Sequence, residues 1–192
     1  MKKGFTLLEL LIVIAILAIL ATVTFVVLNP AQLLAQARDA KRIAELGSTR
    51  NAINMYLAAP SSSSTSLQGT YSCATNCFAG LAVTPGANCG GRHVAATTIA
   101  TTSRAVTGTG WIPVNLGDTS GGSPLAALPV DPVNSSILFY SYACDNTNKV
   151  FELDADMESV AYGFGGPKSV EDKDGGTSTT IYEVGTAPGL AL

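Results

Sequence analysis

The sequence predicts an α+β protein in which one long N-terminal helix lies on a small antiparallel β-sheet. Three observations support this fold class: an apolar run of membrane length near the N-terminus, an amphipathic helical pattern directly after it, and short strand-like segments in the C-terminal part. Only 13% of the 192 residues are charged and the net charge is −3, which excludes a disordered chain and argues against nucleic-acid binding.

Residues 5–28 are predicted to form a membrane-spanning helix. They follow Gly4 and are apolar except for three threonines and one carboxylate, Glu9. As a helix they would span about 36 Å, more than the roughly 30 Å of a bilayer core. The run is too long for a secretory signal, and no Ala-x-Ala site stands directly at its end. Because Lys2 and Lys3 precede the run, we expect the N-terminus to stay in the cytoplasm.

The first residues carry a resemblance to a known family. Lys2-Lys3-Gly4, followed by Phe5 and then by Glu9, resembles the class III leader and N-terminal helix of type IV pilins and pseudopilins over residues 2–28. The resemblance implies that a prepilin peptidase cuts between Gly4 and Phe5, removes residues 1–4 as a leader and methylates the new amine of Phe5. It also implies the pilin fold and a role as a filament subunit.

Glu9 needs a physical explanation, because a carboxylate at the middle of a membrane helix costs about 2.5–3.5 kcal/mol. After cleavage the Phe5 amine, with an ordinary pKa of about 7.7–8.0, would lie one helical turn away. In a filament the amine of one subunit can meet Glu9 of a neighbour, and a charge left unpaired away from water is penalised. We therefore predict that Phe5 and Glu9 set the register of assembly. The alternative is a Glu9 side chain that reaches the membrane interface and has no role in assembly.

These features lead to a functional hypothesis: a structural subunit held in the inner membrane, with its N-terminus in the cytoplasm, and then polymerised into an extracellular or periplasmic filament. The expected partners are copies of the chain, the prepilin peptidase, the membrane platform of the assembly machine and the lipid bilayer, with no nucleic acid. A type II secretion pseudopilin is the alternative, and a membrane-anchored enzyme or binding protein is a weaker one. One histidine and scattered serines suggest no catalytic triad, so we predict no enzyme activity and no catalytic residues.

Residues 29–58 predict an amphipathic helix. Asn29-Pro30 marks either a kink in one helix or the start of a fresh helix with Asn29 as its cap, and the sequence leaves both open. The face expected to pack on the sheet carries apolar residues at helical spacing: Leu33, Leu34, Ala37, Ala40, Ile43, Leu46, Ile53, Tyr56 and Leu57. Charged residues are expected on the remaining surface: Arg38, Lys41, Arg42, Glu45 and Arg50.

Residues 59–109 predict a loop rich in Ser, Gly and Thr, with a tether at residues 60–66 and an irregular insertion after it. An even number of cysteines downstream of an export-type segment favours disulfides, and three pairings are open. A zinc site is the runner-up, because the cysteine spacing is loose for zinc. The disulfide candidates are Cys73, Cys77, Cys89 and Cys144.

Residues 110–192 predict the antiparallel sheet of a globular head. Strand-like segments occur at residues 111–116, 137–143, 149–153 and 179–184, and residues 145–148 fit a hairpin turn between the second and the third. Asp154, Asp156 and Glu158 alternate, so we expect them on one solvent-facing side of a strand. The alternatives for this acidic face are metal binding and contact with a basic patch of the next subunit.

No cofactor is predicted, with one qualification for calcium. Residues 171–175 begin like a calcium loop, which makes Asp172 and Asp174 candidate ligands, although the late glutamate of an EF-hand is missing. A solvated acidic turn is the plainer interpretation. His93, the only histidine, has no ligand set near it in the sequence, so we expect it on the surface without a role.

Charge is unevenly distributed along the chain. Residues 29–117 hold six basic and two acidic residues, whereas residues 118–192 hold eleven acidic and three basic ones. The folded protein is therefore expected to have a positive end and a negative end, which would suit head-to-tail stacking of identical copies. The alternative is two solvated faces with no meaning for assembly.

Overall fold

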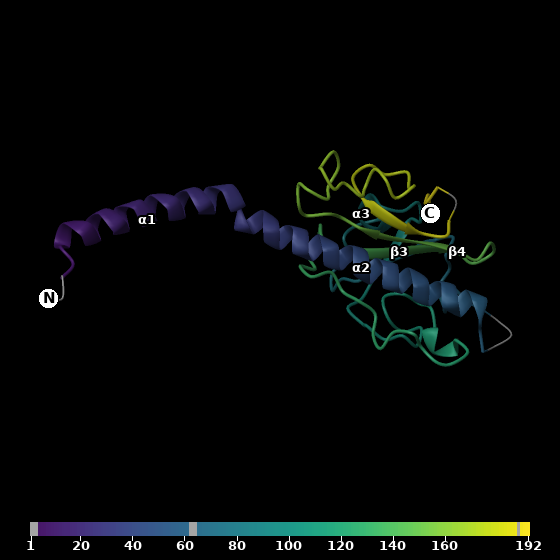
Figure 1. The fold of residues 1–192 in the computed structure, drawn as a ribbon. Helices are drawn as coiled ribbons and strands as arrows, with labels where there is room; N and C mark the ends of the chain where they lie inside the picture. Colours follow the sequence, from purple (N-terminus) through teal and green to yellow (C-terminus); the bar gives the residue numbers. More distant parts are fainter. Residues whose placement is uncertain (1–3, 62–64, 188) are drawn as a thin grey trace.

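The computed structural model describes residues 4–61, 65–187 and 189–192 (Figure 1). Residues 1–3 of the predicted leader, with Lys2 and Lys3, and residues 62–64 of the predicted tether lie outside the described residues. The elements in chain order are α1 (Leu7–Leu28), α2 (Pro30–Ala58), β1 (Asn76–Ala79), α3 (Asn88–Gly91), β2 (Thr97–Ala100), the 3₁₀ turn η1 (Leu116–Asp118), β3 (Tyr140–Asp145), β4 (Val150–Ala155) and β5 (Tyr182–Gly185). The predicted α+β class is confirmed.

Figure 1 shows α1 projecting away from the head, whereas α2 lies along it. The two helices join at Asn29, whose backbone takes the left-handed conformation with φ 38° and ψ 75°. Asn29 ends α1 and also caps α2, because its side chain accepts a hydrogen bond from the Gln32 amide, and Pro30 occupies the first turn of α2. Of the two alternatives that the sequence left open, the structure has the fresh, capped helix, and the join also bends the chain.

The face of α2 that packs on the head differs from the predicted one in its first half. Leu33 and Leu34 are 51% and 61% exposed, and Ala37 and Ala40 are exposed as well. The buried residues are Ala35, Asp39, Arg42, Leu46, Thr49, Ala52, Ile53 and Tyr56. The prediction was wrong here because it assigned charged residues to solvent. In the structure Arg42 pairs with Asp131 of the head, and Asp39 pairs with Arg42 and accepts from backbone amides of the head, so both can be buried.

The sheet has five strands in the order β2-β1-β3-β4-β5. It is mixed rather than purely antiparallel, because β1 and β2 pair in parallel and the other three pairs are antiparallel. The predicted hairpin between β3 and β4 is confirmed. Its turn is held by Asp145, whose Oδ1 accepts hydrogen bonds from the amides of Thr147 and Asn148 at 2.8 and 3.0 Å.

Two strand predictions were wrong. Residues 111–116 carry buried side chains but form no strand, because Pro113 cannot donate to a ladder and the segment runs through the core as a loop. Conversely, the insertion predicted to be irregular contains β1 and β2. Each strand has only four residues, which gives a weak strand signal, and neighbouring strands determine their pairing. The last strand also begins later than predicted, at Tyr182.

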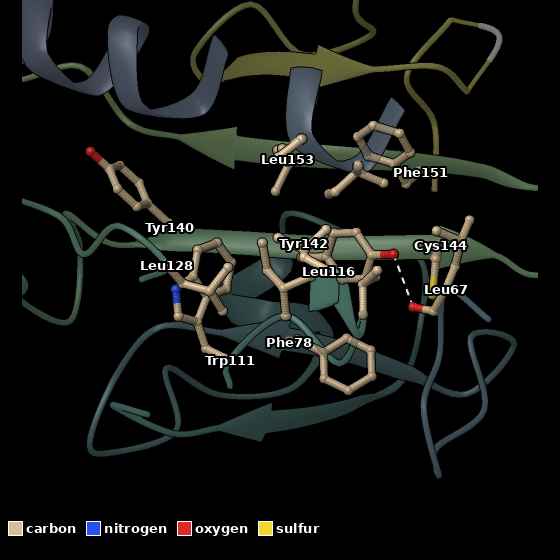
Figure 2. Close-up of a cluster of buried hydrophobic side chains, with 14 of the residues drawn as sticks. Leu67, Phe78, Trp111, Leu116, Leu128, Tyr140, Tyr142, Cys144, Phe151 and Leu153 are labelled. Carbon is tan, nitrogen blue, oxygen red and sulfur yellow. Dashed lines mark hydrogen bonds between the residues drawn. The ribbon is translucent and has the colours of Figure 1, made fainter. Parts of the chain in front are cut away.

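One face of the sheet and the buried side of α2 enclose the main apolar core (Figure 2). Tyr142 and Phe151 project from β3 and β4, and Trp111 and Leu128 come from the long loop before β3. The polar atoms at the rings find partners: the Tyr142 hydroxyl donates to the Leu67 carbonyl at 2.9 Å, the dashed line in Figure 2. Trp111 Nε1 donates to the carbonyl of Pro129 at 2.8 Å.

All four cysteines form disulfides, as predicted, and the structure determines the pairing. Cys73 is bonded to Cys144 across 71 positions of the chain, and Cys77 to Cys89 across 12. The first bond ties the loop before β1 to the end of β3. The second ties β1 to α3, which lies over the face of the sheet away from α2.

Candidate functional site

The N-terminal end of α1 brings the predicted processing and assembly residues together. Gly4 and Phe5 are exposed and lie in a non-helical segment just before α1, so the bond between them is accessible. A Cβ atom at Gly4 would meet nothing within 4 Å, so the chain itself does not require glycine there. Glu9 lies in the first turn of the helix and is also exposed.

Thr6 is a residue that the sequence analysis missed. It is the N-cap of α1 and forms a capping box with Glu9: the Thr6 amide donates to Glu9 Oε2 at 2.9 Å, and the Glu9 amide donates to Thr6 Oγ1 at 3.2 Å. The Thr6 hydroxyl also donates to Glu9 Oε2 at 2.8 Å. A threonine three residues before a glutamate, ahead of an apolar run, is the signal that could have revealed it. Glu9 therefore helps to start the helix, in addition to any role in assembly.

The described side chains of α1 are apolar on every side of the helix, apart from Glu9, Thr22 and Thr24, and all of them are exposed. The most apolar 18-residue stretch of the helix has a mean hydropathy of 3.2 and none of it is buried. The 22 residues of α1 span about 33 Å, close to the thickness of a bilayer core. The hydroxyls of Thr22 and Thr24 donate to carbonyls of the preceding turn at 2.8 Å, which reduces their cost in an apolar medium. The helix therefore fits membrane anchoring.

An ion-pair network fixes α2 on the head. Arg42 is fully buried and its guanidinium donates to both oxygens of Asp131, at 2.6 and 2.9 Å, and to Asp39 at 2.7 Å. Asp39 in turn accepts from the amides of Glu158 and Ser159 at 2.9 and 2.8 Å. Burial alone would lower the pKa of Arg42, but the bonds and charges of these carboxylates raise it above its ordinary value. Arg42 therefore stays charged.

The network also reduces the predicted separation of positive and negative charge between two ends of the folded protein. Arg38 and Arg42 belong to the basic part of the chain, and Asp131 and Glu158 to the acidic part. In the structure they meet, because Arg38 forms a two-bond pair with Glu158 and Arg42 pairs with Asp131. Much of the asymmetry along the sequence is thus neutralised inside the subunit, where it positions α2.

The carboxylates of the acidic C-terminal loop accept hydrogen bonds from nearby residues. Asp172 Oδ1 accepts from the Ser169 hydroxyl at 2.5 Å, and this bond lowers the pKa of Asp172. Asp174 accepts from the amides of Gly176 and Glu183 at 2.9 and 2.7 Å. Their oxygens thus serve the loop's own geometry, and calcium binding by Asp172 and Asp174 stays a prediction.

The face of the sheet away from α2 holds a second polar cluster, and here two expectations were wrong. Asp154 is fully buried rather than solvent-facing, because β4 is an interior strand and residues around α3 cover this face. His93 is 5% exposed and lies against Asp154 and Glu152, rather than on the surface. Sequence spacing gave no signal for this cluster, since its members are about 60 positions apart.

The comparisons with known proteins concern the N-terminus. Residues 1–25 match the family model described as the prokaryotic N-terminal methylation motif. No curated protein and no solved structure matches the chain. The match confirms the predicted type IV pilin and pseudopilin signature, and it points to a structural subunit rather than an enzyme.

Proposed function

We propose that this chain, which carries the N-terminal signature of type IV pilins and pseudopilins, is the structural subunit of a type IV pilus-like filament. A prepilin peptidase cuts it between Gly4 and Phe5 and methylates Phe5. The subunit waits in the inner membrane with its N-terminus in the cytoplasm. A membrane platform then polymerises it through α1 into a filament outside that membrane.

The observation that carries this proposal is that the described apolar side chains of α1 are all exposed. An apolar helix without a partner in its own chain needs lipid or other helices around it. A bilayer satisfies this need before assembly, and copies of α1 satisfy it in a filament core. A simple membrane anchor would need only the first of these environments.

The surface of α2 supports the filament over the anchor. Its first half exposes Leu33, Leu34, Ala37 and Ala40 and buries Asp39 and Arg42. These four apolar residues lie at helical spacing, so they extend the apolar surface of α1 beyond the membrane-length segment. In a filament this strip would lie against neighbouring helices, whereas a plain tether would expose polar residues to water.

Blocking the cleavage site gives the first test. The change Gly4→Val should leave unprocessed chain in the membrane, because the peptidase must accommodate a bulky side chain at the cut. The open space around Gly4 means that the substitution does not strain the chain itself. Mass spectrometry of the membrane fraction measures the N-terminus. Mature chain beginning with a methylated Phe5 in this variant would contradict the proposal.

The role of Glu9 can be separated from its role as a helix cap. Glu9→Gln keeps the capping box, since glutamine fills the same position, but removes the charge. It should leave the processed membrane pool intact and reduce filaments on the order of a hundredfold or more, because a buried amine without its partner costs about 3–5 kcal/mol. Filaments sheared from cells and the membrane pool of the same cells are compared by immunoblot.

Thr6→Ala is the matched control, because it breaks the capping box and keeps the carboxylate. Losing a cap costs about 0.5–2 kcal/mol of local helix stability, so this variant should still form filaments. If Thr6→Ala abolishes filaments and Glu9→Gln does not, Glu9 acts as a cap and not in registration. Abundant filaments from Glu9→Gln as the sole subunit would reject the registration role.

The resemblance to major pseudopilins implies calcium binding in a C-terminal loop, so the acidic loop favours a second candidate, the pseudopilin of a type II secretion system. In that case calcium held by Asp172 and Asp174 would order the loop, and the filament would stay in the periplasm. Imaging decides between the two: sheared surface filaments containing this chain support a pilus, and their absence despite a processed membrane pool supports a secretion pseudopilin.

A further inference from the structure

The face of the sheet away from α2 is unusual because it buries acidic side chains. Phe151 and Leu153 of β4 point into the apolar core, so the alternate residues Glu152 and Asp154 point to the other face. That face is closed by residues around α3, and Glu152 and Asp154 are 1% and 0% exposed. Two carboxylates buried side by side need a proton or a cation between them.

His93 faces both carboxylates. Its Nε2 lies 3.3 Å from Asp154 Oδ2, and its Nδ1 lies 3.9 Å from Glu152 Oε1. One ligand atom from each of the three residues lies within 4.8 Å of the others. Among the residues that the structure describes, neither ring nitrogen of His93 and neither carboxylate oxygen of Asp154 has a hydrogen-bond partner, although all four atoms are buried. Buried polar atoms are normally paired, so these four atoms are available to a ligand.

The Arg92 guanidinium lies near Asp154, but its hydrogen bonds go to other groups. Arg92 itself donates to the carbonyls of Phe139 and Ile137, at 2.7 and 2.5 Å, and stacks on the Phe139 ring. Its five donors are therefore partly used elsewhere, and it makes no hydrogen bond to Asp154.

We infer that His93, Glu152 and Asp154 bind one divalent transition-metal ion, of the class that zinc represents. A neutral imidazole with two carboxylates is a donor set that zinc accepts, whereas calcium takes oxygen ligands alone. The site is distinct from the acidic loop of Asp172 and Asp174 and is independent of the proposed filament role.

The metal ion would cross-link two parts of the fold. His93 follows α3 directly, while Glu152 and Asp154 belong to β4, so one ion joins the covering layer to the sheet. The C-terminus joins the same site, because the Leu192 amide donates to Glu152 Oε2 at 2.8 Å and the Leu192 carbonyl accepts from the Val94 amide at 2.7 Å. The disulfide between Cys77 and Cys89 holds the other end of this layer.

Zinc is the probe for the test, with the full chain purified in detergent and stripped by a chelator. The protein should take up one zinc ion per chain, measured by elemental analysis and by competition with a chromophoric chelator. At free zinc about a hundredfold above the dissociation constant, thermal unfolding should shift upward by roughly 5–10 °C. Re-adding the chelator should reverse the shift.

Two variants localise the ion. His93→Asn should lose the thermal shift. Loss of a residue that only supports a metal ligand weakens metal binding roughly 10- to 100-fold, so loss of the ligand His93 should weaken zinc binding by at least that factor. Asp172→Asn removes a carboxylate from the acidic loop and should bind zinc as the unmodified chain does. Equal binding by the unmodified chain and His93→Asn, or loss of binding in Asp172→Asn, would overturn the inference.

A folding defect in His93→Asn does not remove the test, because the unmodified chain decides alone. X-ray absorption of its zinc complex should show an imidazole nitrogen together with oxygen ligands. Absence of zinc uptake, or a shell made of oxygen only, would overturn the proposed site.

Discussion

α1 and α2 are consecutive helices of 22 and 29 residues, and they differ in where their partners lie. The described side chains of α1 are apolar apart from Glu9, Thr22 and Thr24 and are all exposed, whereas α2 carries charged residues and buries Arg42 completely. Hydrophobicity therefore does not say which helix is buried in the subunit. The partners of α1 must come from lipid or other subunits, and those of α2 come from the head.

This difference divides the expected effects of substitutions. Changes in the buried side of α2 should alter the free energy of unfolding of the head, because its contacts are internal. Changes in α1 should leave that free energy alone and act on membrane insertion and assembly.

The largest effect is expected from Arg42→Met. The change removes the cation and leaves the buried carboxylates of Asp39 and Asp131 without compensation. Breaking a buried pair in this way costs about 3–5 kcal/mol of folding stability. Urea unfolding of the full chain in detergent, followed by near-UV circular dichroism, measures the loss.

Lys41→Met is the control on the neighbouring residue. Lys41 is 56% exposed at its side chain and pairs with Glu45 at 3.6 Å within the same helix, so the change should cost only about 0.3–0.5 kcal/mol. Equal losses for Arg42→Met and Lys41→Met would show that the network does not fix α2 on the head.

The two disulfides should differ in their contribution to the head. In the loop-closure model the bond between Cys73 and Cys144, with 71 positions between its ends, contributes about 4 kcal/mol, and the bond between Cys77 and Cys89, with 12, about 3 kcal/mol. Paired Cys→Ser variants measure each contribution by urea unfolding. The far-ultraviolet signal of α1 should persist after the head unfolds. A larger loss from the shorter loop would contradict this account.

The contrast between the two helices also explains how far the sequence could predict the structure. The apolar run, the Asn29-Pro30 join and the β3–β4 hairpin depend on local chemistry, and all three are found. At the processing site, Gly4, Phe5 and Glu9 form a compact local motif. The capping box of Thr6 was also readable, since its signal spans only four residues.

The predictions that were wrong concern residues whose burial depends on contacts between distant segments. Arg42 is buried only because Asp131, 89 positions away, folds against it. His93 is buried because α3 packs on the sheet, far along the chain from Glu152 and Asp154. Periodicity assigns charged residues to solvent by default, so it cannot anticipate a buried charge whose partner is supplied by tertiary structure.

The smallest effect gives the sharpest comparison, because one substitution can be made in both helices. Ile53 of α2 is 0% exposed and Ile12 of α1 is 48% exposed. Removing one methylene from a packed core costs about 0.5–1.5 kcal/mol, so Ile53→Val should lower the free energy of unfolding of the head by that amount. Ile12→Val should not change it, since Ile12 and the other described side chains of α1 are exposed. Both residues are β-branched, so the small change in helix propensity cancels between the two variants.

Urea unfolding of each variant in the same detergent measures the difference, and the sheared filament yield shows whether Ile12→Val acts on assembly instead. If Ile12→Val destabilises the head as much as Ile53→Val does, α1 is folded against its own subunit, and the division between an internally partnered helix and an externally partnered one is wrong.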